Sequence, residues 1–532
     1  MAKHKILVSD PISEVGIELL KQHPDLDVDV KIGISPEDLL KVISDYEGLV
    51  VRSQTKVGRD VFDASNGSLK AVGRAGVGVD NIDREAATDH GVVVMNTPTG
   101  NTISTAEHAF SLLTALARNI PQAHASIVAG KWERKAFQGV ELNQKRLAVL
   151  GMGRIGSEFA KRAQAFGMTV VAYDPFLSAS RASSLKVELA ESVDQALTGA
   201  DVVTLHMPLN DETKHLVDAK RLALMNPGAL VINCARGGLV DEAALSAAIE
   251  SGHVAGAGLD VYEVEPPNIS DPLFGHPKVV FTPHLGASTA EAQENVGIQV
   301  AEQILSFFVE GSITNAVNMP SLDGKTLEEL GPILDMAKAL GRSLAKLAPS
   351  QADALRVNFY GSIADLDTAL ITRMVLVGYL ENARQESQVN LVNATAFAKQ
   401  MGLRVTESSM AEDADFTELL QVEVVKGEDR YSASGTFFGN TPRIVEINGH
   451  RVEASTTGQL LVVENDDTPG IVGLVGTLLG TESLNIANMS LSREAQGGRA
   501  LTLIELDSQP SASLLEALAK NPSIHQATPV SL

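Results

Sequence analysis

The stretch RLAVLGMGRIGSEFAKRAQAFGMTVVAYDP, residues 146–175, decides the fold of this chain. An apolar run typical of a strand leads into Gly151, Gly153 and Gly156, at the spacing GxGxxG, and a helical pattern follows. Glycines at these positions permit a tight turn, the close approach of a pyrophosphate and close packing of helix on strand. The N-terminus of the helix offers free amides to phosphates. The stretch therefore predicts a Rossmann unit that binds a dinucleotide.

The second strand of this unit ends at Asp174, 18 residues beyond Gly156. A carboxylate at this place can accept hydrogen bonds from the ribose hydroxyls of the adenosine, and it repels a 2′-phosphate. The sequence thus predicts NAD rather than NADP as cofactor. The alternative is a plain glycine turn followed by an aspartate that caps the next loop.

Apolar runs alternate with helical patterns on both sides of this stretch. Residues 5–98 contain KILVSD, VDVKI, GLVVRS, KAVGRAG and VVVMN, which predict the strands of an open parallel sheet. A long helix follows, for which Ser104 and Glu107 stand at capping-box spacing. The helical pattern at 291–311 is expected to pack back on the first unit. We therefore expect two lobes with a cleft between them, the second lobe inserted into the first.

The pattern changes after about residue 319. Residues 320–455 mix helices with strand-like pieces and contain no catalytic constellation, and residues 459–532 follow the order βαββαβ. The predicted fold is α/β, with a Rossmann domain inserted into a flavodoxin-like substrate domain and two α+β units after it. The predicted domains are 1–98 with 285–318 (substrate), 99–284 (NAD), 319–456 (intervening) and 457–532 (regulatory).

The bulk composition limits the function classes. A chain of 532 residues is too long for one hydrophobic core, and its net charge of −23 argues against nonspecific binding to nucleic acid or to an anionic membrane. No run of 18 apolar residues predicts a membrane span. One cysteine forms no internal disulfide, which favours a reducing compartment. We expect a cytoplasmic protein without a metal site.

Three polar residues follow successive strands of the Rossmann unit. Arg236 follows ALVIN, Glu265 follows AGAGLDVYE, and His284 follows KVVFTP. Ligands bind beyond the carboxyl ends of the strands in such sheets. Arg236 can bind the carboxylate of a 2-hydroxy acid, His284 can take its hydroxyl proton, and Glu265 can orient the imidazole. The alternative for each residue alone is a capping, loop or packing role.

These motifs resemble a known family. GMGRIG, YDP, NCARGG, GLDVYEVEPP and PHLGAST together are similar to the D-isomer-specific 2-hydroxyacid dehydrogenases, over about residues 1–318. VRSQTKV, VGRAGVGVDNID, MNTPTGNTISTAEH and GKWERKAF resemble the branch that acts on D-3-phosphoglycerate. The remainder resembles the long form of that branch, with an intervening domain, able in that form to bind an anionic effector, and a C-terminal ACT domain.

The resemblance implies roles for individual residues. The catalytic set falls on Arg236, Glu265 and His284. The cofactor contacts, besides the glycines, fall on Arg154, Ile155, Asp174, Cys234, Asp260 and Gly286. The backbone of Gly76, Val77 and Gly78 matches the loop that meets the substrate carboxylate. Met207 departs from the family, whose members often carry a hydroxyl residue there.

Basic residues support a phosphorylated substrate. Arg52 and Arg74 stand at predicted strand ends of the first lobe, and Lys131, Arg134 and Lys135 crowd a loop that can reach a neighbouring subunit in the family. Such a cluster in an acidic chain would draw a trianionic substrate to the cleft. The alternative for the loop is a solvated surface.

The C-terminal unit carries a candidate effector site. ACT domains that bind serine hold the amino acid across a dimer interface, and the matching positions here are Asn465, Asp467 and Asn485, with Asp467 meeting the ammonium group. The alternative is helix capping together with a dimerisation edge.

The resemblance implies NAD-dependent oxidation of D-3-phosphoglycerate to 3-phosphohydroxypyruvate. This is the first step of L-serine biosynthesis, and the resemblance implies feedback by L-serine and a homodimer or homotetramer. The alternatives are a glyoxylate or hydroxypyruvate reductase, and a non-catalytic protein that senses NADH.

Overall fold

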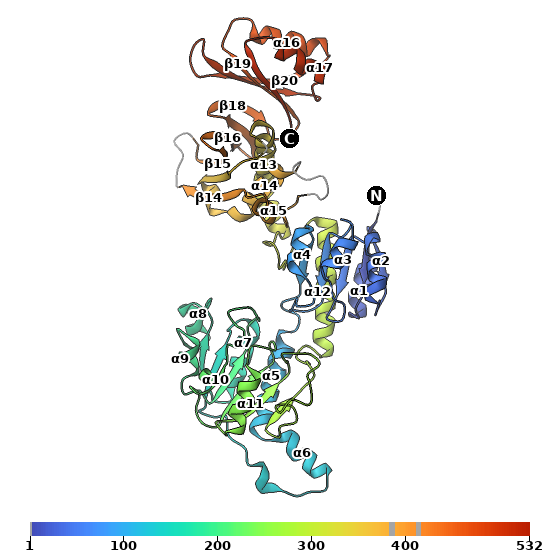
Figure 1. Ribbon diagram of the computed structural model, residues 1–532, viewed down its shortest axis with the longest axis vertical. Helices are drawn as coiled ribbons and strands as arrows, with labels where there is room; N and C mark the ends of the chain where they lie inside the picture. The colour runs from blue at the N-terminus through green and yellow to red at the C-terminus, as the bar shows by residue number, and fades with distance from the viewer. Residues whose placement is uncertain (1–2, 350, 382–388, 411–415) are drawn as a thin grey trace.

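The protein is built around four β-sheets that follow one another along an elongated molecule (Figure 1). The computed structural model describes residues 3–349, 351–381, 389–410 and 416–532. The first two sheets belong to two lobes, and the other two form a tail beyond them. Among the described residues, no helix combines the length and apolar character needed to cross a bilayer.

The first lobe is a parallel sheet with the strand order β2-β1-β3-β4-β5. The order is that of a flavodoxin-like sheet, as predicted. Its strands are almost wholly buried in the centre because helices cover both faces. The elements are β1 (His4–Val8), α1 (Glu14–Gln22), β2 (Leu26–Val30), α2 (Pro36–Val42), η1 (Ile43–Asp45), β3 (Gly48–Val51), α3 (Arg59–Ala64), β4 (Ala71–Arg74), α4 (Arg84–Asp89) and β5 (Val93–Asn96).

The second lobe is a seven-stranded parallel sheet with the order β12-β11-β10-β9-β6-β7-β8. Its strands are β6 (Arg146–Leu150), β7 (Thr169–Tyr173), β8 (Glu188–Leu189), β9 (Val202–Leu205), β10 (Ala229–Asn233), β11 (Val254–Leu259) and β12 (Val279–Phe281). Its helices are α5 (Thr102–Ala117), α6 (Ile120–Val128), η2 (Arg134–Phe137), α7 (Arg154–Ala165), α8 (Ala179–Ser184), α9 (Val193–Leu197), α10 (Ala219–Leu222) and α11 (Glu242–Glu250). The predicted Rossmann unit is confirmed.

Helix α12 (Ala290–Glu310) returns the chain to the first lobe, where it packs on α1 (Figure 1). The second lobe is therefore inserted into the first, as the sequence predicts. The chain crosses between the lobes before α5 and again before α12, and the two crossings contact each other. Thr105 Oγ1 donates to Gly286 O at 3.1 Å, and the hydroxyls of Ser104 and Thr289 lie 2.6 Å apart.

The predicted capping box at Ser104 and Glu107 is wrong. Helix α5 begins three residues earlier than a capping box at Ser104 requires, with Asn101 as its N-cap. The Ser104 hydroxyl instead contacts the start of α12, and Glu107 accepts from Arg162 at 2.9 Å. Ser104 thus joins the two crossings between the lobes, and Glu107 joins α5 to α7 within the second lobe.

The tail contains two antiparallel-rich sheets. The first has the order β14-β13-β15-β16-β17-β18 and consists of α13 (Gly324–Leu347), β13 (Ala354–Gly361), η3 (Ser362–Asp365), α14 (Thr368–Leu380), α15 (Ala394–Gln400), β14 (Arg404–Met410), β15 (Glu418–Lys426), β16 (Asp429–Phe438), β17 (Thr441–Ile447) and β18 (His450–Ser455). The second has the order β20-β21-β19-β22 and consists of β19 (Gln459–Asp466), α16 (Ile471–Thr481), β20 (Ile486–Arg493), β21 (Arg499–Leu506), α17 (Ala512–Ala519) and β22 (Ile524–Ser531). The predicted order βαββαβ is confirmed.

Two glycines let α12 approach α1. A Cβ atom at Gly16 would overlap the backbone carbonyl of Gly297, and one at Gly297 would overlap the side chain of Ser13. A backbone carbonyl cannot turn aside as a flexible side chain can. The return of the chain to the first lobe therefore depends on the absence of a side chain at Gly16.

We predict that Gly16→Ala destabilises the first lobe by about 1–3 kcal/mol, the usual cost of overpacking. The measurement is thermal unfolding followed by circular dichroism. Gly473→Ala on α16 is the control, because a Cβ there meets no atom within 4 Å and alanine favours a helix. Equal melting temperatures for the two variants would contradict the prediction.

Candidate active site

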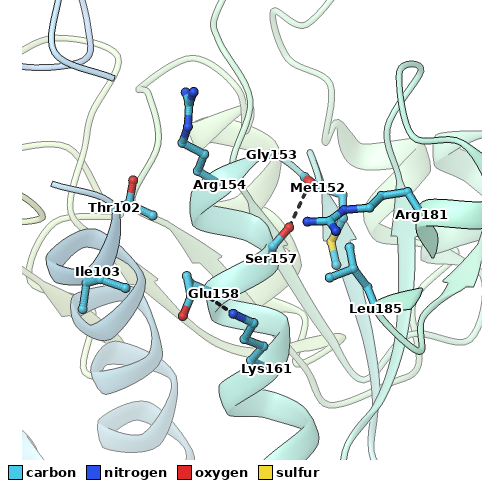
Figure 2. A pocket seen from close by; sticks show the side chains of 10 residues that line it. All are labelled: Thr102, Ile103, Met152, Gly153, Arg154, Ser157, Glu158, Lys161, Arg181 and Leu185. Atoms are coloured by element: carbon cyan, nitrogen blue, oxygen red, sulfur yellow. Dashed lines mark hydrogen bonds and ion pairs between the residues drawn. The ribbon is translucent and has the colours of Figure 1, made fainter. Parts of the chain in front are cut away.

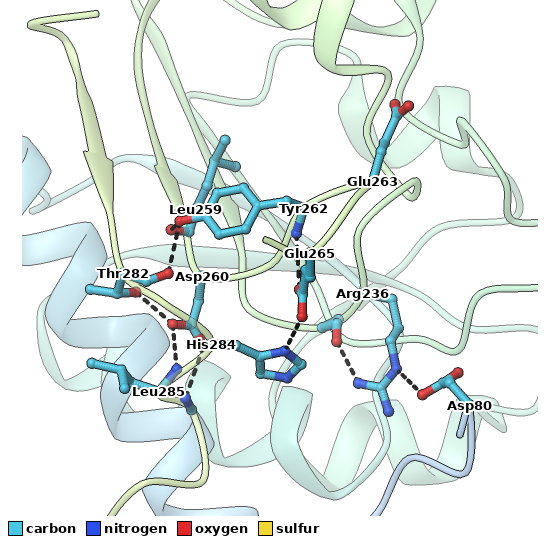
Figure 3. Close-up of polar contacts among 12 residues, drawn as sticks. Asp80, Arg236, Leu259, Asp260, Tyr262, Glu263, Glu265, Thr282, His284 and Leu285 are labelled. Carbon is cyan, nitrogen blue, oxygen red and sulfur yellow. Dashed lines mark hydrogen bonds and ion pairs between the residues drawn. The ribbon is translucent and has the colours of Figure 1, made fainter. Parts of the chain in front are cut away.

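Arg236, Glu265 and His284 lie together beyond the ends of β10, β11 and β12 (Figure 3). Nδ1 of His284 lies 2.8 Å from Oε2 of Glu265, and Oε1 of Glu265 accepts from the amide of Tyr262 at 3.2 Å. The carboxylate thus fixes the ring and leaves Nε2 for the proton of a ligand. A carboxylate paired with an imidazole in this way supports general acid–base chemistry.

The backbone of His284 is held in the left-handed region, at φ +55°. Its amide donates to Asp260 O at 2.9 Å, and the next two amides, of Leu285 and Gly286, donate to the Asp260 carboxylate at 2.7 and 2.8 Å. Non-glycine residues adopt this conformation only where the surroundings enforce it. Asp260 therefore determines where the imidazole stands.

Asp260 is fully buried, and hydrogen bonds keep its carboxylate ionised. Burial alone would raise its pKa, but hydrogen bonds from His108, Thr282 and the amide of Leu285 lower the pKa below its ordinary value. Both carboxylate oxygens are thus engaged by groups of the protein itself. The predicted contact of Asp260 with the cofactor stays a prediction.

Arg236, in the second lobe, contacts Asp80 of the first lobe (Figure 3). Nε donates to Asp80 Oδ2 at 3.0 Å, and Nη1 donates to Ala235 O at 2.6 Å. A Cβ atom at Gly78 would overlap the guanidinium group, so the glycine is needed for this approach. The loop predicted to meet a substrate carboxylate, Gly76 to Gly78, therefore lies beside Arg236.

Two further arginines approach the same place from the first lobe. Arg74, at the end of β4, is largely buried, and burial together with the charges of Arg236 and Arg52 lowers its pKa to about 10. Burial also lowers the pKa of Arg52, which Asp10 partly offsets. Nε of Arg74 has no hydrogen-bond partner among the described residues. The charges of Arg236 and Arg52 act on Arg74, and a multiply charged anion is the kind of ligand that such a group of arginines can bind. The predicted substrate contacts of Arg52 and Arg74 stay predictions.

The glycine loop has the geometry that a pyrophosphate requires. Gly151 has φ +94°, and a Cβ there would lie 2.5 Å from His206 O; a Cβ at Gly156 would overlap Gly151 O. A Cβ at Gly153 would meet no atom within 4 Å, so the backbone at the start of α7 is open. These three features fit the close approach of a dinucleotide.

A pocket of about 290 Å³ lies over the first turns of α7 (Figure 2). Gly153 and Arg154 line it, with Thr102 from α5 and Arg181 from α8. Arg154 is exposed and Ile155 is half-buried. Their predicted cofactor contacts stay predictions that this position supports.

Asp174 supports the glycine loop. Oδ2 accepts from the amide of Met152 and Oδ1 from the amide of Phe176, both at 2.8 Å. Cys234, the first residue after β10, is 6% exposed, and burial raises the pKa of its thiol well above the ordinary value. The predicted cofactor contacts of Asp174 and Cys234 stay predictions.

Sequence reasoning missed three residues of the site. Asp80 holds Arg236, and His108 and Thr282 hydrogen-bond to Asp260. Asp80 stands in VGVDNID and His108 in STAEH, both among the family-like motifs. The strand-end rule does not reach Asp80 or His108, because the first lies in a loop of the other lobe and the second within helix α5. Thr282 directly follows β12, so the rule could have found it.

The basic loop does not meet the other cations within one chain. Lys131, Arg134 and Lys135 are exposed and follow α6, at the end of the second lobe that lies away from the first (Figure 1). They are therefore not neighbours of Arg52 and Arg74 in a single copy of the chain.

The three predicted effector residues lie in different surroundings within one chain, and their role stays a prediction. Asn465 is 1% exposed, and its side chain accepts from Thr502 Oγ1 at 3.0 Å, because it points into the sheet. Asp467 accepts from Arg493 at 2.9 Å and from the amide of Gly497 at 3.0 Å, which lowers its pKa. Only Asn485 is exposed, with Nδ2 on Asp507 at 2.9 Å. The three residues do not form an open site in one chain.

Comparisons with known proteins agree with this geometry. Residues 110–286 match the family model of the D-isomer specific 2-hydroxyacid dehydrogenase NAD binding domain, and residues 329–448 match the D-3-phosphoglycerate dehydrogenase intervening domain. A D-3-phosphoglycerate dehydrogenase of Archaeoglobus fulgidus is 43% identical over 99% of this chain and 100% of its own. That of Bacillus subtilis is 41% identical over 98% of each chain.

Solved structures resemble the two lobes. A glyoxylate reductase from Paecilomyes thermophila superposes with a TM-score of 0.56 and 31% identity, over 60% of this chain and 99% of its own. A D-lactate dehydrogenase from Aquifex aeolicus, complexed with NAD and lactic acid, gives 0.53 and 27%, over 60% and 100%.

Proposed function

The chain belongs to the D-3-phosphoglycerate dehydrogenases, within the D-isomer-specific 2-hydroxyacid dehydrogenase family, and we propose that it oxidises D-3-phosphoglycerate to 3-phosphohydroxypyruvate with NAD. This reaction is the first step of L-serine biosynthesis. The observation that carries the proposal is the His284–Glu265 pair beside Arg236, at the sheet edge that also carries the glycine loop. The charge of the substrate supports it further, since three arginines meet in the cleft.

Different residues bind the two ends of the substrate. Arg236 and the backbone of residues 76–78 bind the carboxylate and the C2 oxygen, while Arg74 and Arg52 bind the phosphate. Burial lowers the pKa of Arg74 most, and the charges of Arg236 and Arg52 lower it further; an anion there would offset this repulsion. The Asp80 carboxylate is largely exposed to solvent, so the substrate can take over part of its hydrogen bonding with Arg236.

His284 moves the proton. Nε2 takes the proton of the C2 hydroxyl, the C2 hydrogen leaves with its electron pair, and a carbonyl forms at C2. Glu265 stabilises the imidazolium that results, through its contact with Nδ1. Bound NAD supplies the acceptor of the hydride, and the glycine loop, Arg154 and Asp174 would hold it.

We predict that the purified protein reduces NAD in the presence of D-3-phosphoglycerate and that His284→Ala lowers kcat/KM about 10²- to 10⁴-fold, the usual contribution of a general base. Absorbance at the NADH band measures the rate. NADH binding, followed by fluorescence, should persist in the variant. If the wild-type protein binds NADH but turns over no 2-hydroxy or 2-oxo acid, a non-catalytic NADH sensor is the better interpretation.

A second candidate is a reductase of glyoxylate or hydroxypyruvate, since a glyoxylate reductase is among the similar structures. Such a substrate has no phosphate and gives Arg74 and Arg52 no partner. We therefore rank it below the oxidation of phosphoglycerate.

We predict that Arg74→Gln separates the two candidates. The variant should raise KM for D-3-phosphoglycerate about 10- to 100-fold, because a hydrogen bond to a charged group contributes about 1.5–3 kcal/mol. The KM for hydroxypyruvate should change little, since that acid has no phosphate. A wild-type KM for both acids in the variant would favour the reductase.

We also propose that the protein is a homodimer or homotetramer. Helix α6 has no buried residue in one chain, and apolar side chains are exposed on it and after it: Ile120, Ile127, Val128 and Trp132. A second copy of this chain would cover them and bring Arg134 and Lys135 toward its cleft.

We place the enzyme in the cytoplasm, because its single cysteine is a buried free thiol.

The C-terminal βαββαβ unit resembles an ACT domain, and we propose L-serine as its effector. Asn485 remains the exposed candidate contact, at the start of β20. Asn465 and Asp467 support the strand and the β20–β21 hairpin from within.

We predict that L-serine at millimolar concentration slows NAD reduction and that Asn485→Ala raises the half-inhibiting concentration about tenfold, equivalent to ~1.4 kcal/mol for one lost hydrogen bond. D-serine is the control ligand. If L-serine does not change the rate of NAD reduction, the C-terminal unit serves assembly and not regulation.

A further inference from the structure

A histidine outside the catalytic set contacts the carboxylate that holds His284. His108, on α5, places Nε2 at 3.1 Å from Asp260 Oδ1 and at 3.0 Å from Thr282 Oγ1. Thr282 donates its hydroxyl proton to the same Oδ1 at 2.5 Å. His108 Nε2, Asp260 Oδ1 and Thr282 Oγ1 thus form a closed triangle of polar atoms beside the segment 282–286, which carries His284.

The donors in this triangle fix the protonation of His108. Thr282 has one hydroxyl proton, and Asp260 accepts it, so Thr282 can only accept from His108. Asp260, ionised and without protons of its own, can also only accept. Nε2 of His108 must therefore carry a hydrogen, which it shares between the two oxygens.

The triangle is connected to the catalytic base through the backbone. Asp260 receives the amides of Leu285 and Gly286, and its carbonyl receives that of His284. Thr282 O, two residues before His284, accepts from Tyr262 Oη at 2.8 Å. A rotation of the Asp260 carboxylate would thus move both sides of His284 together.

We propose that His108 is a positioning residue for His284, acting through Asp260 and Thr282. Asp260 is fully buried, and a buried carboxylate that loses a donor turns toward other partners or takes up a proton. Either change alters the bonds to residues 284–286, which keep His284 at its positive φ. The inference rests on the proposed function, since it assigns a role within that reaction.

The test compares three variants in the full chain. His108→Phe keeps a ring and removes the donor, His108→Gln keeps an N–H donor, and Thr282→Val removes the hydroxyl that joins His108 to Asp260. His253→Phe is the matched control, because the His253 ring contacts Leu222 O at 3.0 Å and lies at the opposite end of β11 from Asp260.

We expect kcat of His108→Phe to fall about 10- to 100-fold, the effect of a small misplacement of a catalytic group. KM for D-3-phosphoglycerate and the Kd of NADH should stay within about threefold, since the arginines and the glycine loop are unchanged. Thr282→Val should resemble His108→Phe, whereas His108→Gln should recover most of kcat. His253→Phe should match the wild type.

A kinetic isotope effect separates positioning from loss of folded protein. With D-3-phosphoglycerate deuterated at C2, the effect on kcat should increase in His108→Phe, because hydride transfer becomes the slow step. A smaller fraction of folded enzyme lowers kcat and leaves the isotope effect unchanged, which would overturn the proposal. Equal losses in the glutamine and phenylalanine variants, or wild-type kcat in both, would overturn it as well.

The failure of the proposed function would be visible separately. If the wild-type protein reduces glyoxylate or hydroxypyruvate but does not oxidise D-3-phosphoglycerate, the substrate assignment is wrong. The same variants, assayed with the acid that is reduced and with C4-deuterated NADH, still decide whether His108 positions His284.

Discussion

The buried carboxylate of Asp260 is the interaction on which the active site depends. It lies at the end of β11. It receives hydrogen bonds from His108 on α5, from the hydroxyl of Thr282 and from the consecutive amides of Leu285 and Gly286. A buried charge is costly unless it is fully hydrogen-bonded, so the surrounding groups are held in place by the same bonds that stabilise it. The position of His284, with its unusual backbone conformation, follows from this arrangement.

Charge balance in the cleft is the second determinant. Three arginines approach from both lobes, and the carboxylates near them, Asp10 and Asp80, do not neutralise them in full. Asp10 is buried and accepts from the backbone around residues 52–55, so it shapes the loop more than it pairs with a cation. The remaining positive charge makes the cleft attractive to an anion although the chain as a whole is acidic.

Much of this could be predicted from the sequence, because parallel strands are continuous apolar runs and their carboxyl ends meet at one edge. That reasoning placed Arg236, Glu265 and His284 together. It could not find His108 or Asp80, whose roles depend on how α5 and the first lobe face the second. Ser104 was misinterpreted for a related reason: a local pattern shows that a side chain can cap a helix, and only packing decides which partner it meets.

The two crossings between the lobes have a mechanical consequence. They are hydrogen-bonded to each other at Thr105 and Gly286, so any rotation of one lobe against the other would turn about this point. His284 lies two residues from that pivot, and a point near an axis is displaced least by rotation. Closure of the cleft would leave the imidazole and its carboxylate almost stationary while moving Arg52 and Arg74 through a longer arc. Such a rotation would move the groups that hold the distant end of a substrate more than the atoms that exchange the proton.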